Sequence, residues 1–100
     1  MIKYLDKKDD LDSIINKGTW LIDFYAEWCG PCRMFSDIAE SIDFIDILKI
    51  DVDTFPEIAK EFGIMSIPTL LYFKDGEEMY KKIGLQSYEE VKDIVDNKLK

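Results

Sequence analysis

The chain has 100 residues, 47% of them hydrophobic, and a chain of this length can bury one sizeable core but not two. Its 13 basic and 21 acidic side chains give a net charge of -8, which repels nucleic acid and anionic membrane surfaces. We therefore expect a single domain over residues 1–100 that binds neither nucleic acid nor a membrane.

The first half of the chain alternates between strand and helix patterns. Strands are expected at Met1–Leu5, Trp20–Ala26 and Ile45–Val52. Apolar residues recur at helical spacing in the two segments between them, namely at Leu11, Ile14 and Ile15 and then at Phe35, Ile38, Ala39 and Ile42. Such a crossover pairs the strands around Phe24 and Ile50 in parallel and brings active residues to their carboxyl ends.

The second half changes pattern. Pro56 and Gly63 bracket a short helix, and two strand-like runs, Thr69–Lys74 and Glu77–Ile83, are joined by the turn dipeptide Asp75-Gly76. A capping box, Ser87–Glu90, then begins a helix that carries Val91, Ile94 and Val95 on one face. We expect an α/β fold with a central mixed sheet of four to five strands and helices on both faces.

The only two cysteines, Cys29 and Cys32, are separated by Gly30-Pro31 at the transition from strand to helix. A tight turn could bring their thiols within disulfide distance, and a thiolate at a helix start has a lowered pKa, which makes it a nucleophile. Zinc is excluded by ligand count, because the chain has no histidine and no second cysteine pair, and we expect no metal and no cofactor.

The N-terminal residues lack the apolar stretch of a secretory signal, and no segment approaches membrane-spanning length. We therefore expect the chain to stay in the cytoplasm. A lone cysteine pair in a reducing compartment is a poor permanent crosslink, so the compartment and the spacing of the cysteines both favour redox cycling.

Several motifs stand in an order that identifies a family. They are Asp23–Cys32, Lys49–Asp53, Phe62–Thr69 and the glycines Gly76 and Gly84. Together they make the chain resemble the thioredoxin family over nearly its full length. The resemblance implies the thioredoxin fold and a monomeric, cytosolic protein-disulfide reductant, with disulfide-containing client proteins and a thioredoxin reductase of unspecified type as partners.

The resemblance also implies roles for four residues. Cys29 is the exposed attacking thiolate and Cys32 the buried resolving thiol of a reversible Cys29–Cys32 disulfide. Asp23 is a buried proton acceptor for Cys32, and Lys49 lies beside it. The residues alone leave an alternative open, in which strand alternation turns Asp23 outward and Lys49 is an ordinary surface lysine.

A client-binding patch around the cysteines is implied in the same way. The Ile67–Pro68 bond is expected to be cis, and the Ile67 backbone to pair with an extended client segment. The patch comprises Trp28, Gly30, Pro31, Ser66, Ile67, Pro68 and Gly84. Without the resemblance, Pro68 is a trans loop proline and Trp28 either fills the core or is partly exposed beside the turn.

Two departures from the family bear on recognition by the reductase. Asp37 stands where thioredoxins usually carry a kinking proline, and Ser41–Ile47 is several residues shorter than is common. Two other functions remain alternatives: a thiol oxidase or isomerase of the same fold, and an interaction subunit without redox activity. Gly30-Pro31 favours the reductant, and the intact cysteine site argues against the interaction subunit.

Overall fold

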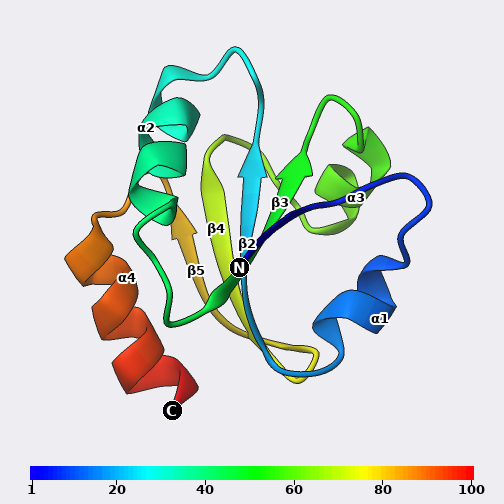
Figure 1. Ribbon diagram of the computed structural model, residues 1–100. Coiled ribbons are helices and arrows are strands. Elements are labelled where there is room, and N and C mark those ends of the chain that lie inside the picture. Colours follow the sequence, from blue (N-terminus) through cyan, green and yellow to red (C-terminus); the bar gives the residue numbers. More distant parts are fainter.

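A five-stranded sheet forms the centre of the molecule in the computed structural model, which describes all of residues 1–100 (Figure 1). Its strands follow the order β1-β3-β2-β4-β5. Strands β1 and β2 pair in parallel with β3, whereas β2–β4 and β4–β5 are antiparallel. The strands are β1 (Ile2–Tyr4), β2 (Thr19–Tyr25), β3 (Asp46–Asp51), β4 (Thr69–Lys74) and β5 (Glu77–Ile83). The predicted mixed sheet is confirmed.

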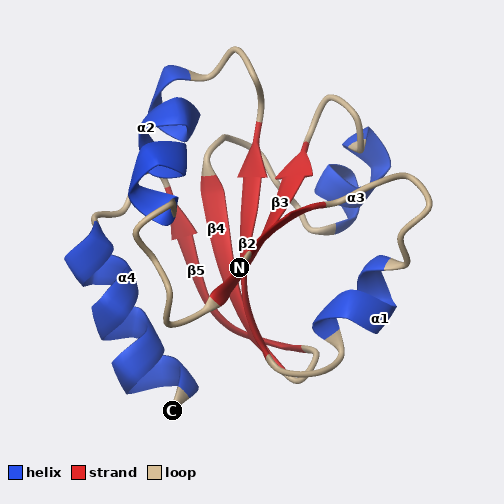
Figure 2. Cartoon of the chain, in the orientation of Figure 1, coloured by secondary structure: helices blue, strands red, loops and turns tan.

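Helices cover both faces of the sheet (Figure 2). Two apolar clusters fill the spaces between them, one beneath α2 and the C-terminal helix and one beneath α1 and α3. The helices are α1 (Leu11–Ile15), α2 (Gly30–Ala39), α3 (Pro56–Glu61) and α4 (Tyr88–Ile94), the last continuing as a π-helical segment, η1 (Val95–Leu99). None of these helices has the length and apolar character needed to cross a membrane.

Local sequence features account for the register and the turns. Phe24 is paired with Ile50 across β2 and β3, as the crossover predicts. Asp75 and Gly76 adopt positive φ angles of 48° and 86°, which the tight β4–β5 turn requires. The predicted capping box is present, with reciprocal hydrogen bonds between Ser87 and Glu90 at the start of α4.

One helix boundary differs from the prediction. Ile42, expected on the apolar stripe of the second helix, lies beyond the end of α2. The backbone N–H groups of Ser41 and Ile42 donate to carbonyls three residues back, so the chain leaves the helix in tight turns. Ile42 is nevertheless buried in the cluster beneath α2, which explains its apolar character.

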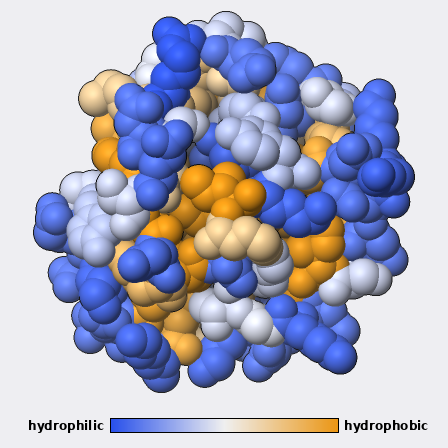
Figure 3. All heavy atoms as spheres, viewed as in Figure 1, coloured by the Kyte–Doolittle hydropathy of each residue, from blue (hydrophilic) through white to orange (hydrophobic).

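The surface matches the acidic composition. The face seen in Figure 3 is largely hydrophilic, with apolar side chains grouped near its middle. The carboxyl ends of β2 and β3 point to the same edge of the sheet, where the β2–α2 loop carries the cysteines (Figure 1). The sheet therefore brings the cysteine pair and the residues that end β2 and β3 to one end of the molecule.

Candidate active site

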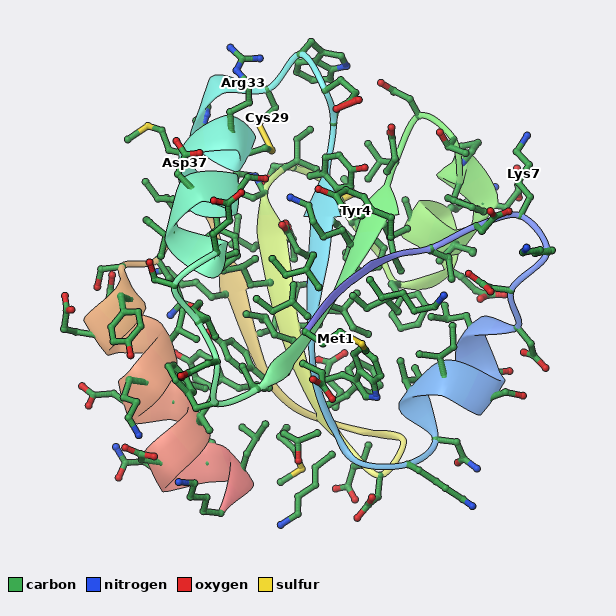
Figure 4. The ribbon with its side chains drawn as sticks, in the orientation of Figure 1. Met1, Tyr4, Lys7, Cys29, Arg33 and Asp37 are labelled. Carbon is green, nitrogen blue, oxygen red and sulfur yellow. A yellow bond between two sulfur atoms is a disulfide. The ribbon has the colours of Figure 1, made fainter.

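The cysteine pair lies at the first turn of α2, where Cys29 is the N-cap residue. Its Sγ accepts a hydrogen bond of 3.2 Å from the Cys32 backbone N–H, and the two sulfurs form a disulfide with a Cα–Cα distance of 5.2 Å. Figure 4 shows this bond between the top of α2 and the loop from β2. In the reduced protein, the unpaired N–H groups and dipole of α2 stabilise a thiolate on Cys29.

Side chains anchor the loop on either side of the cysteines. The Trp28 indole N–H donates to Asp53 Oδ2 at 2.9 Å, and the Arg33 guanidinium donates to the Glu27 carbonyl oxygen at 2.9 Å. Trp28 is still 68% exposed, which confirms the predicted exposure and excludes a core role. The loop is therefore fixed while the face of the indole stays open to solvent.

An apolar groove of about 550 Å³ opens beside Cys29. Five of the seven predicted patch residues line it, namely Trp28, Gly30, Pro31, Ser66 and Ile67. Four residues that the sequence reasoning missed also line it: Val52, Ala59, Ile64 and Met65. Three of these four lie within the family motifs, Val52 in Lys49–Asp53 and both Ile64 and Met65 in Phe62–Thr69, whereas Ala59 lies in none.

Two predicted patch residues lie outside the groove lining. The Ile67–Pro68 bond is cis, as predicted, and the Gly84 N–H donates to the Pro68 carbonyl oxygen at 2.8 Å. Pro68 and Gly84 therefore contact each other, although neither lines the groove. The Ile67 carbonyl oxygen lies 4.0 Å from Cys29 Sγ, so this backbone is the part of the segment closest to the attacking sulfur.

Asp23 and Lys49 form a buried pair where β2 and β3 are in register. Asp23 is 0% exposed and Lys49 is 3% exposed, so the alternative in which both face solvent is wrong. Lys49 Nζ lies 3.3 Å from Asp23 Oδ2, yet neither carboxylate oxygen has a hydrogen-bond donor in the protein. Burial raises the pKa of Asp23 to about 6, against the opposing effects of the Lys49 charge and of the long N–H···O contact from Lys49.

The Lys49 ammonium has further contacts that no motif predicted. It donates a hydrogen bond to Ser36 Oγ from α2, and it lies 4.6 Å from the centre of the Tyr25 ring and 5.7 Å from that of Tyr4. A cavity of about 60 Å³ adjoins this group, lined by Tyr4, Tyr25, Ala26, Glu27, Cys32, Arg33, Ser36 and Lys49. Both Cys32 and Lys49 thus border a space large enough for a water molecule.

Asp37, the departure on α2, is exposed and points away from the sheet in Figure 4, as does Arg33. Neither side chain forms a hydrogen bond or ion pair with Asp23 or Lys49: Arg33 borders the small cavity but donates to the Glu27 carbonyl oxygen. The substitution at Asp37 therefore leaves the geometry of the cysteine site intact.

Comparison with known proteins agrees with this geometry. A thioredoxin family model matches residues 2–97. Thioredoxins of Staphylococcus epidermidis and Staphylococcus aureus are 45% and 43% identical over 95 residues, which cover 90% of this chain and 91% of each relative.

Solved structures are also similar over nearly the whole chain. A mutant thioredoxin from Halobacterium salinarum has a TM-score of 0.88 at 33% identity and covers 99% of this chain and 91% of its own. Thioredoxin from Malassezia sympodialis has a TM-score of 0.83 at 28% identity, and the match covers 97% of this chain and 92% of the Malassezia chain.

Proposed function

Because the chain belongs to the thioredoxin family and is a protein-disulfide reductant, we propose a specific course for the reaction. The Cys29 thiolate attacks one sulfur of a client disulfide, forms a mixed disulfide and releases the other client sulfur as a thiolate. The Cys32 thiolate then attacks Cys29 Sγ, which forms the Cys29–Cys32 disulfide and releases the second client thiolate. Both client thiolates take up protons, and two electrons have passed from the cysteine pair to the client.

The different surroundings of the two sulfurs support these roles. Cys29 lines the groove, and its Sγ accepts a hydrogen bond from the Cys32 backbone N–H at the start of α2. Both cysteines are largely enclosed, with Cys29 5% and Cys32 1% exposed, but only Cys29 lines the groove, whereas Cys32 borders the small inner cavity. A client disulfide in the groove therefore reaches Cys29 and not Cys32. This difference in access is the observation that carries the assignment.

Asp23 accepts the proton of Cys32 in this proposal. A carboxylate whose pKa is raised to about 6 is a stronger base than an ordinary aspartate and is still ionised at neutral pH. The Lys49 ammonium at 3.3 Å keeps the charged form accessible inside the protein. In this proposal a water in the small cavity relays the proton from Cys32 toward the Asp23–Lys49 pair; Cys32 and Lys49 border that cavity, and Asp23 lies behind Lys49 at 3.3 Å from its ammonium.

The client binds in the groove, in extended conformation against the Ile67 backbone. Main-chain pairing of this kind tolerates many client sequences, and the apolar lining from Trp28 to Met65 contacts the residues that flank the client cysteine. The Pro68 ring and Gly84 shape the segment from outside the groove lining.

We also propose that the protein acts in the cytoplasm as a monomeric single domain and that a thioredoxin reductase returns it to the dithiol form. A reducing compartment favours repeated cycling of the cysteine pair over a permanent crosslink. The reductase contacts the same face, because it must reach the Cys29–Cys32 disulfide.

Equilibrium titration of the cysteine pair against glutathione tests the reducing direction. We expect a potential near that of thioredoxins, about −270 mV, with the dithiol and disulfide forms separated by alkylation and mass spectrometry. A potential near about −120 mV would instead identify a thiol oxidase. A normal potential with no reduction of a protein disulfide such as that of insulin would favour the interaction subunit.

A further inference from the structure

Ser36 connects the helix that carries Cys32 to the buried ion pair. It lies four residues after Cys32 on α2, so both side chains are on one face of the helix. Its hydroxyl oxygen accepts a hydrogen bond from Lys49 Nζ, and Ser36 and Cys32 border the same small cavity. No residue pattern in the sequence assigns it a role.

Lys49 contacts Asp23 by charge and by a long, poorly directed N–H···O contact rather than by a well-formed hydrogen bond. Nζ is 3.3 Å from Oδ2, yet both oxygens of the fully buried carboxylate are without a protein donor. An ammonium has three N–H donors, and here one is directed to Ser36 while the Tyr25 ring lies 4.6 Å away on another side. The well-directed N–H of Lys49 is therefore the one that Ser36 accepts, and this contact, rather than the one with Asp23, sets the orientation of the ammonium.

We propose that Ser36 is a positioning residue for proton transfer: by accepting the hydrogen bond of Lys49, it holds the ammonium beside Asp23 while keeping the carboxylate free of a hydrogen bond. The ammonium then stabilises the charge of Asp23 through space. The carboxylate lone pairs stay available to the proton that leaves Cys32. This inference rests on the role of Asp23 in the proposed function.

The other charged and titratable groups around this site do not duplicate the contact. They are Tyr4 on β1, Tyr25 on β2, Asp51 on β3, Glu27 in the loop, and Cys32 and Arg33 on α2. Burial raises the pKa of Tyr25 to about 12, so its ring is neutral over the physiological range. The Arg33 guanidinium is directed to the Glu27 carbonyl, and Asp23 has no basic partner other than Lys49.

Replacing the hydroxyl should redirect Lys49 to Asp23. In Ser36→Ala the ammonium loses its acceptor, and the nearest buried acceptor is Asp23 Oδ2. A hydrogen bond to the charged carboxylate lowers its pKa, so we expect the pKa of Asp23 to fall from about 6 toward 3.8, by about one unit. Ser36→Thr keeps the hydroxyl and should retain the parental value.

The rate of the resolving step should follow this change. A weaker base slows proton removal from Cys32, so at pH 8 we expect Ser36→Ala to resolve a mixed disulfide about three-fold more slowly than the parent. At pH 5 the variant has the larger ionised fraction of Asp23, so the difference should vanish or reverse. A general disturbance of α2 would instead slow resolution at every pH.

Two measurements on the full-length reduced protein test the proposal. Carboxyl carbon NMR follows the titration of Asp23 in the parent, Ser36→Ala and Ser36→Thr. Single-turnover release of thionitrobenzoate from a mixed disulfide on Cys29 gives the pH profile of resolution. We expect a lowered Asp23 pKa and a profile shifted to lower pH in Ser36→Ala, with the parental pKa and profile in Ser36→Thr.

An unchanged or raised pKa of Asp23 in Ser36→Ala would overturn the proposal, because Lys49 would then not have been held back from the carboxylate. An equal change in Ser36→Thr would also overturn it, since the hydroxyl would not be the cause. The titration does not depend on turnover. A lowered pKa without any change in the resolving rate would therefore leave the positioning by Ser36 intact and contradict the proposed role of Asp23.

Discussion

Two pairs of buried polar side chains in this molecule differ in whether their polar atoms are hydrogen-bonded. Tyr72 and Gln86 are 0% and 3% exposed, and the Tyr72 hydroxyl donates to Gln86 Oε1 at 2.5 Å. Asp23 and Lys49 are equally buried, yet the carboxylate has no hydrogen-bond donor. The first pair satisfies its polar groups within the core beneath α4, and the second leaves an acid unsatisfied beside Lys49.

The difference separates a structural pair from a reactive one. A buried polar group without a partner destabilises the folded state, whereas a well-paired one is neutral or stabilising. The core pair therefore serves the fold. The buried acid beside Lys49 has a raised pKa, which in the proposed function makes it a base for the thiol chemistry.

The largest effect is expected at the cysteines. Cys29→Ser should reduce client reduction to background, because no other cysteine lines the groove. Cys32→Ser should also stop turnover but accumulate mixed disulfides with clients on Cys29, because the resolving sulfur is absent. Non-reducing electrophoresis after incubation with a disulfide-containing client distinguishes the two variants.

The order of attack has an independent check. Iodoacetamide should label Cys29 of the reduced parent before Cys32 at neutral pH, since Cys29 is at the helix start and Cys32 is enclosed. Mass spectrometry that finds Cys32 labelled faster would reverse the assignment of nucleophile and resolving thiol.

A second substitution should affect chemistry without loss of the fold. Asp23→Asn should slow the resolving step by about a hundred-fold near neutral pH, because the amide cannot take the proton of Cys32. The attack of Cys29 on a client disulfide should keep its rate, which serves as the internal control. Stopped-flow kinetics of the two steps measure both, and equal slowing of both would place Asp23 outside the proton-transfer path.

Changes to the Tyr72–Gln86 pair should affect stability and leave the chemistry unchanged. Tyr72→Phe leaves Gln86 buried without its donor, so we expect the free energy of unfolding to fall by about 1–3 kcal/mol while client reduction is unchanged. Tyr80→Phe is the matched control, because the Tyr80 ring packs against Tyr72 with centroids 6.0 Å apart and its hydroxyl has no partner in the protein. Equal losses in the two variants would mean that the Tyr72 hydrogen bond contributes nothing measurable.

The smallest effect is expected at the rim of the groove. Met65→Ser removes an apolar side chain that is 93% exposed, so the folded state should be affected little. The KM for a protein disulfide should rise about three-fold, because less apolar surface is buried against the client. Reduction of a small aromatic disulfide reagent is the control, and an equal loss on both substrates would exclude a client contact at Met65.

Much of the fold could be predicted because its local signals agree with one another. The turn at Asp75-Gly76, the capping box at Ser87 and the spacing of the apolar residues each indicate one structure. The end of α2 was less predictable, since Ile42 continues the apolar spacing while the backbone has already turned.

The active site was predictable only in part, for a physical reason. Strand β2 is buried on both faces, so apolar alternation could not tell whether Asp23 faces inward; family resemblance supplied that inference. Ser36 and Tyr4 reach Lys49 from α2 and β1, elements that the sheet order brings together across long stretches of sequence. Contacts of this kind leave no local pattern.

The stability of the protein as a function of pH tests the central claim, that Asp23 is a buried acid kept unsatisfied for catalysis. Its folded pKa of about 6 lies above the ordinary value of 3.8, so the native state holds a proton that the unfolded chain has released. The free energy of unfolding should therefore fall as the pH rises from 3.8, the ordinary pKa of the group, to about 6, its pKa in the folded protein. The Asp23→Ala variant has no carboxyl group at this position, so its stability should not fall over this pH range. Its buried Lys49 still has the Ser36 hydroxyl and the Tyr25 ring as partners.

Denaturant unfolding of the reduced parent and of Asp23→Ala, from pH 4 to pH 8, is the direct measurement. We expect the two proteins to be closest in stability near pH 4 and the variant to exceed the parent by about 1–3 kcal/mol at pH 8. Parallel profiles, or a variant less stable than the parent at pH 8, would contradict the claim and show that Asp23 is well compensated in the folded protein.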